Sequence, residues 1–262
     1  MTERGELAGD PFGRLRALTE ARIGLGHAGP GLPTAASLKL QLDHARACDA
    51  VHTALDVPAL QIALGRKVHV VHSAAADRAT YLQRPDLGRR LAPEVSLPRL
   101  GGDLAIVIAD GLSATAIMAH AAAVVAALPA FLPGWTILDP VIALQGRVAL
   151  GDAIGEQLGA RSVLVLIGER PGLSAADSLG AYLTWAPRIG RRDHERNCVS
   201  NIRVKGGLAP ERAAANIAWL LGEARRIEAT GVVLKDRFGD GAPTLSGPAD
   251  TPRALDAPHG GA

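Results

Sequence analysis

The spacing of apolar residues divides this chain into a helical first part and a second part in which strands alternate with helices. From residue 34 to residue 52, apolar residues recur every three or four positions, which is the period of an amphipathic helix, and Thr34 is a suitable N-cap. The residues of this apolar face are Leu38, Leu42, Ala45, Cys48 and His52. Val68–His72 has the composition of a short strand, and Pro85 favours a helical turn that opens at Arg84–Asp86.

From Asp103 onward, the pattern changes to short, continuous apolar runs separated by helical stretches. Such runs are typical of strands that are covered on both faces. The expected strands are Leu104–Asp110, Trp135–Leu144, Ser162–Ile167 and Gly231–Leu234, and the expected helices are Ala114–Leu128, Val148–Leu158, closed by Gly159, and Pro210–Ala229. The alternation predicts an α/β protein with a Rossmann-like, mostly parallel sheet and helices on both of its faces.

Turn-forming residues separate the two parts of the chain, at Pro93, Pro98 and Gly101–Gly102. We therefore expect a smaller, mainly helical domain over residues 1–99, followed by a Rossmann-like domain over residues 100–237. The tail, residues 238–262, lacks an apolar period and is expected to be disordered, because it buries too little to offset its ordering entropy.

Composition indicates an ordinary apolar core and excludes an obvious polyanion-binding surface. Hydrophobic residues make up 48% of the chain, aromatic residues only 3%, and the formal net charge is +2, so neither stacking platforms nor a strongly basic surface is expected. The two cysteines are far apart in sequence, the first residues lack the order of a secretion signal, and no apolar run approaches the roughly 20 residues of a membrane span. A reduced, cytoplasmic protein is expected.

Several short motifs resemble functional sites, but the surrounding sequence does not support those functions. Gly24–Gly29 matches G-x-G-x-x-G, but it follows a helical pattern where a dinucleotide site requires a strand, so a flexible loop is expected. The segments around Ser113 and Ser174 lack the second glycine of a lipase-type nucleophile. His120 lies among apolar residues of a helix, where a core or boundary residue is more common than a catalytic base.

Helix geometry argues against a three-residue metal site on the first long helix. His44, Cys48 and His52 are spaced four residues apart, and at 1.5 Å per residue the outer two are about 12 Å apart along the axis. Three such side chains cannot meet one ion. A cysteine at the core edge, flanked by surface histidines, is the expected arrangement.

The segment Gly168–Ile202 offers the most chemistry, because it joins the carboxyl end of a buried strand to polar loops. Ligands of open α/β sheets bind beyond the carboxyl ends of the strands. A rim of acceptors and donors is expected there from Asp110, Glu169, Arg170, Cys198 and Asn201. The alternative is that Glu169 and Arg170 only cap helices or pair with surface charges.

The amino-acid sequence of the same region resembles the small subunit of ethanolamine ammonia-lyase. The strings are GERPGL, YLTWAPR and RNCVSNI, with QGRV, IGEQLGA, IADGLS and YLQRPDLGRRL upstream. The similarity runs from about Arg22 to Asp236, and the strings are long, ordered and spaced as a set, which makes the match more specific than any single short motif.

The resemblance implies a function that this chain performs only with a larger partner. Enzymes of that family use adenosylcobalamin to convert ethanolamine to acetaldehyde and ammonia. The large subunit carries the substrate pocket, and the small subunit forms part of the wall around the cobalamin. The matching positions imply cofactor contacts at Val148, Glu169 and Cys198, with Arg170, Asn201 and Asp110 as weaker candidates, and no catalytic residue or metal ligand in this chain.

The resemblance also implies the state of the cofactor and the assembly. The sequence contains no D-x-H-x-x-G string, the motif whose histidine replaces the cofactor's own base in other cobalamin enzymes, so base-on adenosylcobalamin is expected. A hetero-oligomer with equal numbers of both subunits is implied, in the cytoplasm or, in some organisms, within a bacterial microcompartment. The small number of residues before Arg22 leaves little chain for microcompartment targeting.

Two other classes of function remain open at this point. The β-α alternation alone would also suit a nucleotide-binding or oxidoreductase domain, although a correctly placed phosphate loop is missing. The lack of a convincing catalytic constellation would also suit a structural partner that stabilises a large subunit without contacting its cofactor.

Overall fold

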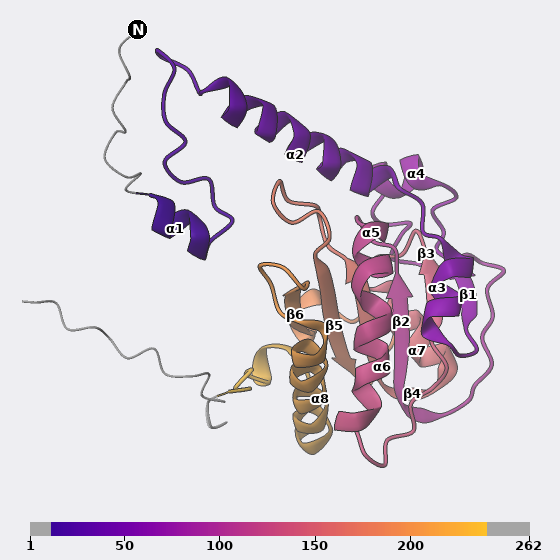
Figure 1. Ribbon diagram of the computed structural model, residues 1–262. Helices are drawn as coiled ribbons and strands as arrows, with labels where there is room; N and C mark the ends of the chain where they lie inside the picture. The colour runs from indigo at the N-terminus through magenta and orange to yellow at the C-terminus, as the bar shows by residue number, and fades with distance from the viewer. Residues whose placement is uncertain (1–11, 240–262) are drawn as a thin grey trace, which may run out of the picture.

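One mixed sheet organises the protein, as the computed structural model, which describes residues 12–239, shows (Figure 1). The strand order is β1-β3-β2-β4-β5-β6. The strands are β1 (His69–His72), β2 (Gly102–Ala109), β3 (Val141–Leu144), β4 (Ala160–Gly168), β5 (Leu179–Trp185) and β6 (Asn197–Ile202). The first four strands in this order are parallel, whereas β5 and β6 are antiparallel to their neighbours.

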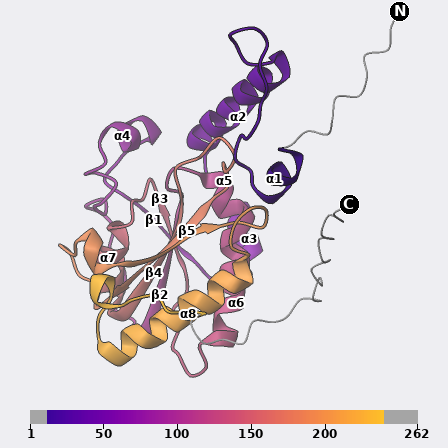
Figure 2. The same cartoon turned by 90° about the vertical axis from the view of Figure 1, so that its left-hand side faces the viewer.

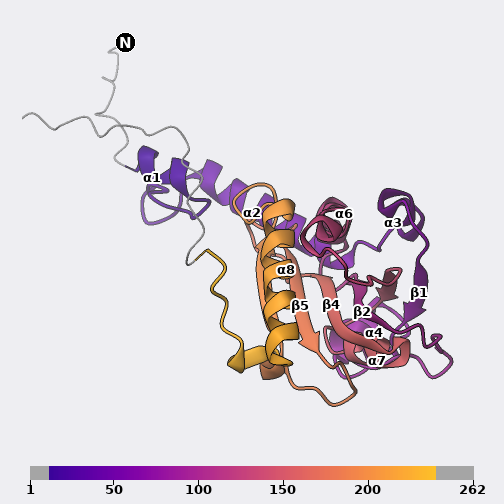
Figure 3. The same ribbon diagram turned by 90° about the horizontal axis from the view of Figure 1, so that it is seen from below.

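Helices cover both faces of the sheet (Figure 3). The helices are α1 (Gly13–Leu18), α2 (Thr34–His52), α3 (Val57–Leu64), α4 (Arg78–Gln83), α5 (Ala114–Ala116), α6 (Ala122–Phe131), α7 (Leu150–Leu158) and α8 (Pro210–Ile227). A π-helical segment, η1 (Ile117–Ala121), joins α5 to α6, and η2 (Asp193–Glu195) and η3 (Gly231–Val233) are short 3₁₀ helices. Helices α3, α6 and α8 pack on one face of the sheet and α7 on the other.

Alternation along the buried strands supplies the two core layers. In β2, Leu104, Ile106 and Ile108 face α6 and α8, while Ala105 and Val107 face α7. Because successive side chains of a strand point to opposite faces, a continuous apolar run serves both layers. This explains why β2 and β4 read as unbroken apolar segments in the sequence.

The expected α/β class with a mostly parallel sheet is confirmed, but two strands were missed. The segment after Gly168, interpreted from sequence as polar loops, contains β5 and β6, which form an antiparallel extension of the sheet. Its signal was present in Leu179–Trp185, where apolar residues alternate with Gly180, Tyr182 and Thr184 in the period of a half-buried strand.

Two strand predictions need correction. Of the expected Trp135–Leu144, Val141–Leu144 forms β3 and Ile137 makes an isolated parallel bridge to Leu104; the ladder is interrupted before Val141, where Pro140 has no N–H. Gly231–Leu234 is not a strand: it contains η3, and the Asn197 side chain bonds the N–H of Gly231 and the carbonyl of Leu234, at 2.7 and 2.8 Å. Those groups are therefore not available for pairing with a neighbouring strand.

The amphipathic pattern of α2 faces the opposite way from expectation. The helix begins at Thr34, but its N-cap is Pro33 and no side chain caps it. Its buried residues are Asp43 and Ala50, on the side that faces the rest of the protein. The predicted apolar face points outward, with Leu38 58% and Leu42 50% exposed. A hydrogen-bonded turn does open at Arg84, where the N–H of Leu87 donates to the carbonyl of Arg84 at 3.0 Å, but it does not continue as a helix after α4 ends at Gln83.

Strand β1 comes from within the expected N-terminal domain, yet it lies at one edge of the sheet and pairs with β3. The division into domains at residues 99 and 100 stays a prediction. The tail expected to be disordered begins at Phe238, and from residue 240 it lies outside the described residues.

One apolar stretch does reach the length of a membrane span, contrary to expectation. Ala114–Phe131 runs through α5, η1 and α6, and its 18 residues are long and apolar enough by composition alone. Its side chains Ile117, Val124 and Leu128 are fully buried in the core layer beneath α8. This is the position of a core helix.

Candidate functional site

Glu169 lies where β4 ends, at the carboxyl edge of the parallel strands. Its Oε2 accepts a hydrogen bond from Ser178 Oγ at 2.5 Å and one from the Asn201 backbone N–H at 3.3 Å. Its Oε1 accepts one from Ser200 Oγ at 2.5 Å. Donors from the β4–β5 loop and from β6 thus hold the carboxylate at one end of the antiparallel extension.

Cys198 reaches the same region through Tyr182. The two residues are paired across β5 and β6, so their side chains share one face of the sheet. The Tyr182 hydroxyl and the Cys198 sulfur influence each other's pKa across this pair, and Glu169 is close enough to act electrostatically on both. A carboxylate, a phenol and a thiol therefore lie together.

This part of the sheet is less covered than the rest. Helix α7 packs on β4 and β2, on the same side of the sheet as Tyr182, while Cys198 and Ser200 are exposed. We call the group Glu169, Tyr182, Cys198 and Ser200 the open face. It presents acceptors, donors and one aromatic edge on a rigid sheet.

Val148 lies in the loop between β3 and α7, and Asp110 positions that loop. The Asp110 carboxylate, at the end of β2, accepts hydrogen bonds from the N–H groups of Gln145 at 3.0 Å and Gly146 at 3.1 Å. It also accepts one from Gly111 N–H at 2.9 Å. Burial raises the pKa of Asp110, while these three N–H groups oppose the rise. Asp110 thus acts on the loop and is itself buried.

The structure brings two of the three expected cofactor residues together directly. Glu169 and Cys198 meet at Tyr182. Val148 is half-buried and packs against the same apolar layer as Tyr182, beneath α7. Their role in binding a cofactor stays a prediction. Of the weaker candidates, Arg170 is exposed, and Asn201 contributes its backbone N–H to Glu169.

Electrostatics keep the thiol of the open face neutral. Neighbouring protein atoms partly desolvate the Cys198 sulfur although the residue is exposed, and this raises its pKa; the hydrogen bond from Tyr182 lowers it and the charge of Glu169 raises it, with a net rise. Since the thiolate is the nucleophile, a raised pKa is unfavourable for covalent catalysis. Burial likewise raises the pKa of Tyr182. The open face suits contacts with a neutral ligand better than it suits nucleophilic chemistry.

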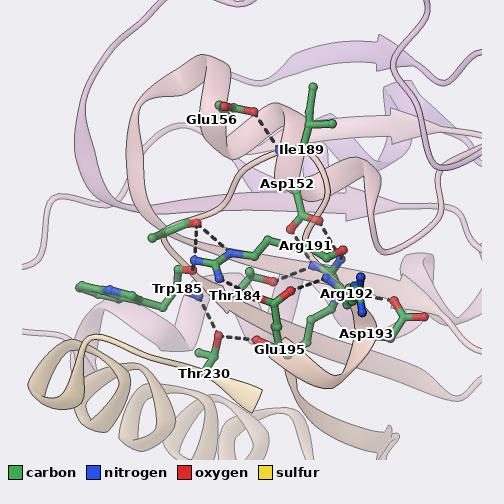
Figure 4. Close-up of polar contacts among 12 residues, drawn as sticks. Asp152, Glu156, Thr184, Trp185, Ile189, Arg191, Arg192, Asp193, Glu195 and Thr230 are labelled. Carbon is green, nitrogen blue, oxygen red and sulfur yellow. Dashed lines mark hydrogen bonds and ion pairs between the residues drawn. The ribbon is translucent and has the colours of Figure 1, made fainter. Parts of the chain in front are cut away.

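Sequence reasoning missed an ion-pair network around the loop before β6, in which one pair is buried and a second is partly exposed (Figure 4). Arg196 and Asp152 form a bidentate pair, and the neighbouring Arg191 and Glu195 form a second pair at 2.6 Å. In the sequence, the charged residues before β6 indicate a solvent-exposed loop and not a buried ion pair. Only the tertiary fold places Asp152 of α7 opposite Arg196.

Other candidate sites receive little support within residues 12–239. No group of three or more potential metal ligands is found there, although Cys48 Sγ lies 3.6 Å from His44 Nε2 on an exposed part of α2. Cys48 is exposed rather than at the core edge. His120 is buried in η1, with Nε2 3.4 Å from Asp177 Oδ2, which fits the expected core or boundary residue. Gly24–Gly29 forms the loop before α2.

Comparison with known proteins identifies consistent relatives over most of the chain. The model of the family described as ethanolamine ammonia-lyase light chain (EutC) matches residues 9–235. The ethanolamine ammonia-lyase small subunit of Xanthomonas campestris pv. campestris is 52% identical over 240 residues, covering 87% of this chain and 88% of the relative. That of Azotobacter vinelandii is 50% identical over 250 residues (90% and 92%), and that of Bradyrhizobium diazoefficiens is 54% identical over 244 residues (89% and 93%).

Proposed function

The chain belongs to the ethanolamine ammonia-lyase light chain family, and we propose that it is the small subunit of an adenosylcobalamin-dependent enzyme converting ethanolamine to acetaldehyde and ammonia. It acts in ethanolamine catabolism together with a large subunit, in equal numbers, and is inactive alone. When bound, adenosylcobalamin supplies the radical chemistry, with its own base kept on cobalt. The setting is the cytoplasm, inside a microcompartment where the organism makes one.

The observation that carries this proposal is the state of Glu169 on the open face. A carboxylate offers about four lone-pair positions, and the chain's own donors Ser178, Ser200 and Asn201 occupy three. The rim of a corrin ring carries neutral amides, whose N–H groups are suitable donors for the remaining position. A charge-assisted bond of this kind is about twice as strong as a neutral one.

The other residues of the site fit a large, mostly neutral ligand. Cys198 offers a small, polarizable, uncharged surface, and Val148 offers an apolar contact next to backbone groups that Asp110 holds in place. This chain's part in the reaction is to bind and orient the cofactor, which itself supplies the radical chemistry.

We assign the outward face of α2 to the large subunit. Leu38 and Leu42 are exposed on a helix whose sequence is amphipathic, and α2 extends beyond the carboxyl ends of the strands (Figures 1 and 2). Exposed apolar stripes of this kind mark interaction surfaces. A large partner that closes over the open face would also meet α2, since both lie at the same end of the sheet.

Substitution of Glu169 tests the cofactor role. The complex of both subunits is assembled with Glu169→Ala or with wild-type chain, and cyanocobalamin is titrated into each. Loss of a hydrogen bond to a charged acceptor weakens binding by about 1.5 to 3 kcal/mol, or roughly 10- to 150-fold. The control is Glu94→Ala, at an exposed glutamate outside the open face. Equal affinities for wild-type and Glu169→Ala complexes would favour a purely structural partner.

A further inference from the structure

A buried ion pair links the helix that follows Val148 to the strand that carries Cys198. Asp152 lies in the first turn of α7, and Arg196 directly precedes β6. Arg196 Nη1 and Nη2 donate to the two carboxylate oxygens of Asp152 at 2.6 and 2.7 Å, and both side chains are 2% exposed. Bidentate pairing fixes the orientation of two groups as well as their distance.

Further contacts hold the guanidinium across β5. Arg196 Nη1 also donates to Thr184 Oγ1 at 2.9 Å, and Nη2 donates to the carbonyl of Arg191 at 3.1 Å. Thr184 is two residues from Tyr182 on the same strand, so both side chains point to the same side of the sheet. The ion pair therefore joins α7 to the side of β5 that also carries Tyr182, and Figure 4 shows Asp152 and Thr184 in this contact region.

An outer layer of contacts holds the loop that precedes Arg196. Arg191 Nη1 donates to Glu195 Oε1 at 2.6 Å, and Arg191 Nη2 donates to the carbonyls of Trp185 and Ala186, at 3.1 and 3.0 Å. The N–H of Ile189 donates to Glu156 Oε2 of α7 at 2.9 Å. The loop is tied to β5 on one side and to α7 on the other.

We propose that Asp152 and Arg196 are positioning residues for the cofactor, whose ion pair sets the separation of Val148 and Cys198. This inference rests on the proposed function. Val148 lies two residues before α7, and Cys198 lies two residues after Arg196. The ion pair therefore connects the two chain segments that carry the expected cofactor contacts. A buried pair adds little net stability compared with apolar residues of the same volume. The ion pair contributes geometry instead: its two hydrogen bonds fix the distance and orientation between α7 and β6 more narrowly than apolar packing would.

The test measures cofactor binding by the assembled complex. Arg196→Lys keeps the charge but loses the planar fork that serves Asp152, Thr184 and Arg191. We expect the dissociation constant of cyanocobalamin to rise about tenfold, which is typical when a residue that orients a ligand-contacting group is replaced. The turnover rate at saturating adenosylcobalamin stays unchanged. The matched control is Arg226→Lys, which alters an exposed pair with Glu223 on α8.

A second variant separates positioning from folding. Asp152→Leu combined with Arg196→Met removes both buried charges, so the chain is expected to fold and assemble while cofactor affinity still falls. Unchanged affinity in this double variant, or in a folded Arg196→Lys, would overturn the inference if Glu169→Ala weakens binding in the same assay. If Glu169→Ala also has no effect, the proposed function itself fails.

Discussion

The hydrogen bonding and the pKa of each residue of the open face depend on neighbouring side chains. Glu169 holds three donors of its own chain and also acts on the thiol of Cys198, while Tyr182 connects the two. None of these relations is between residues adjacent in sequence. The chemical character of each group is therefore set by the sheet that brings them together.

The reactivity of Cys198 reports on this arrangement. Because the charge of Glu169 contributes to the raised pKa of Cys198, Glu169→Gln should lower that pKa and increase the thiolate fraction. We expect alkylation of Cys198 at mildly alkaline pH to become several-fold faster. Mass spectrometry of the labelled peptides provides the rate, and Cys48, the other cysteine, is the internal reference. An unchanged rate would show that the charge of Glu169 does not reach the thiol.

The Glu195 carboxylate makes the free energy of unfolding depend on pH. The N–H of Arg192 and the guanidinium of Arg191 lower the pKa of Glu195 from 4.5 to about 2. A carboxyl whose pKa is lower in the folded state adds stability above its unfolded pKa and loses it as the pH falls toward the folded pKa. The difference in unfolding free energy between wild type and Glu195→Gln should therefore be complete at neutral pH and shrink from pH 4.5 toward 2.

Urea unfolding of both proteins at a series of pH values measures this difference. Carboxyl groups common to the two proteins cancel in it. Glu94→Gln, at an exposed glutamate, is the control and should show no such trend. A difference between wild type and Glu195→Gln that stays constant with pH would contradict the assignment.

At the scale of elements, the loop after β2, which leads to α5, and the loop after β4, which leads to β5, fit closely together. The N–H of Leu112 donates to the carbonyl of Gly168 at 2.9 Å. Gly111 has φ +58°, and a Cβ there would lie 2.3 Å from the same carbonyl oxygen. The glycines allow the two strand ends, and with them Asp110 and Glu169, to approach.

Gly111→Ala should therefore destabilise the protein more than a glycine change without a collision. A left-handed backbone costs an alanine about 1 to 2 kcal/mol, and displacing packed backbone adds about as much again, so we expect a loss of about 3 kcal/mol. Gly134→Ala is the matched control, since Gly134 has φ +75° with nothing within 4 Å of the added Cβ. Chemical denaturation measures both losses, and equal values would contradict the close fit.

The elements themselves were predictable to different degrees. Strand β4 and helices α7 and α8 follow from apolar period, Gly159 and Pro210, because these signals depend on neighbours in sequence. Strands β5 and β6 were missed, since β5 alternates over only seven positions, β6 (NCVSNI) has no regular alternation, and both lie in a charged, glycine-containing segment. Their pairing with β4 makes them strands.

At the scale of the whole molecule, α2 is the part whose sequence and environment disagree within this chain. Its outward leucines, Leu38 and Leu42, leave an apolar surface exposed on the described chain. The assignment of this face to a large subunit removes the disagreement, because the apolar pattern is then satisfied in the assembly.

Replacement of Leu38 and Leu42 by serine tests this assignment. The double variant should bind the large subunit at least about tenfold more weakly, since burying a leucine contributes about 1.5 to 3 kcal/mol. Its melting temperature as a free chain should not change. Analytical ultracentrifugation or a pull-down with purified large subunit measures association. Ile62→Ser on α3, at an equally apolar but 81% exposed position, is the control. Undiminished association of the double variant would exclude α2 from the interface.

The sequence by itself determined the family, the α/β class and the strongly periodic elements, and it singled out Glu169 and Cys198 within one segment. Only the tertiary structure decided which face of α2 is buried, that Tyr182 joins Glu169 to Cys198, and that Arg196 pairs with Asp152 across 44 positions of sequence. The reason is physical: helix and strand periods arise from neighbouring residues, whereas contacts between distant residues exist only after the chain has closed into one sheet.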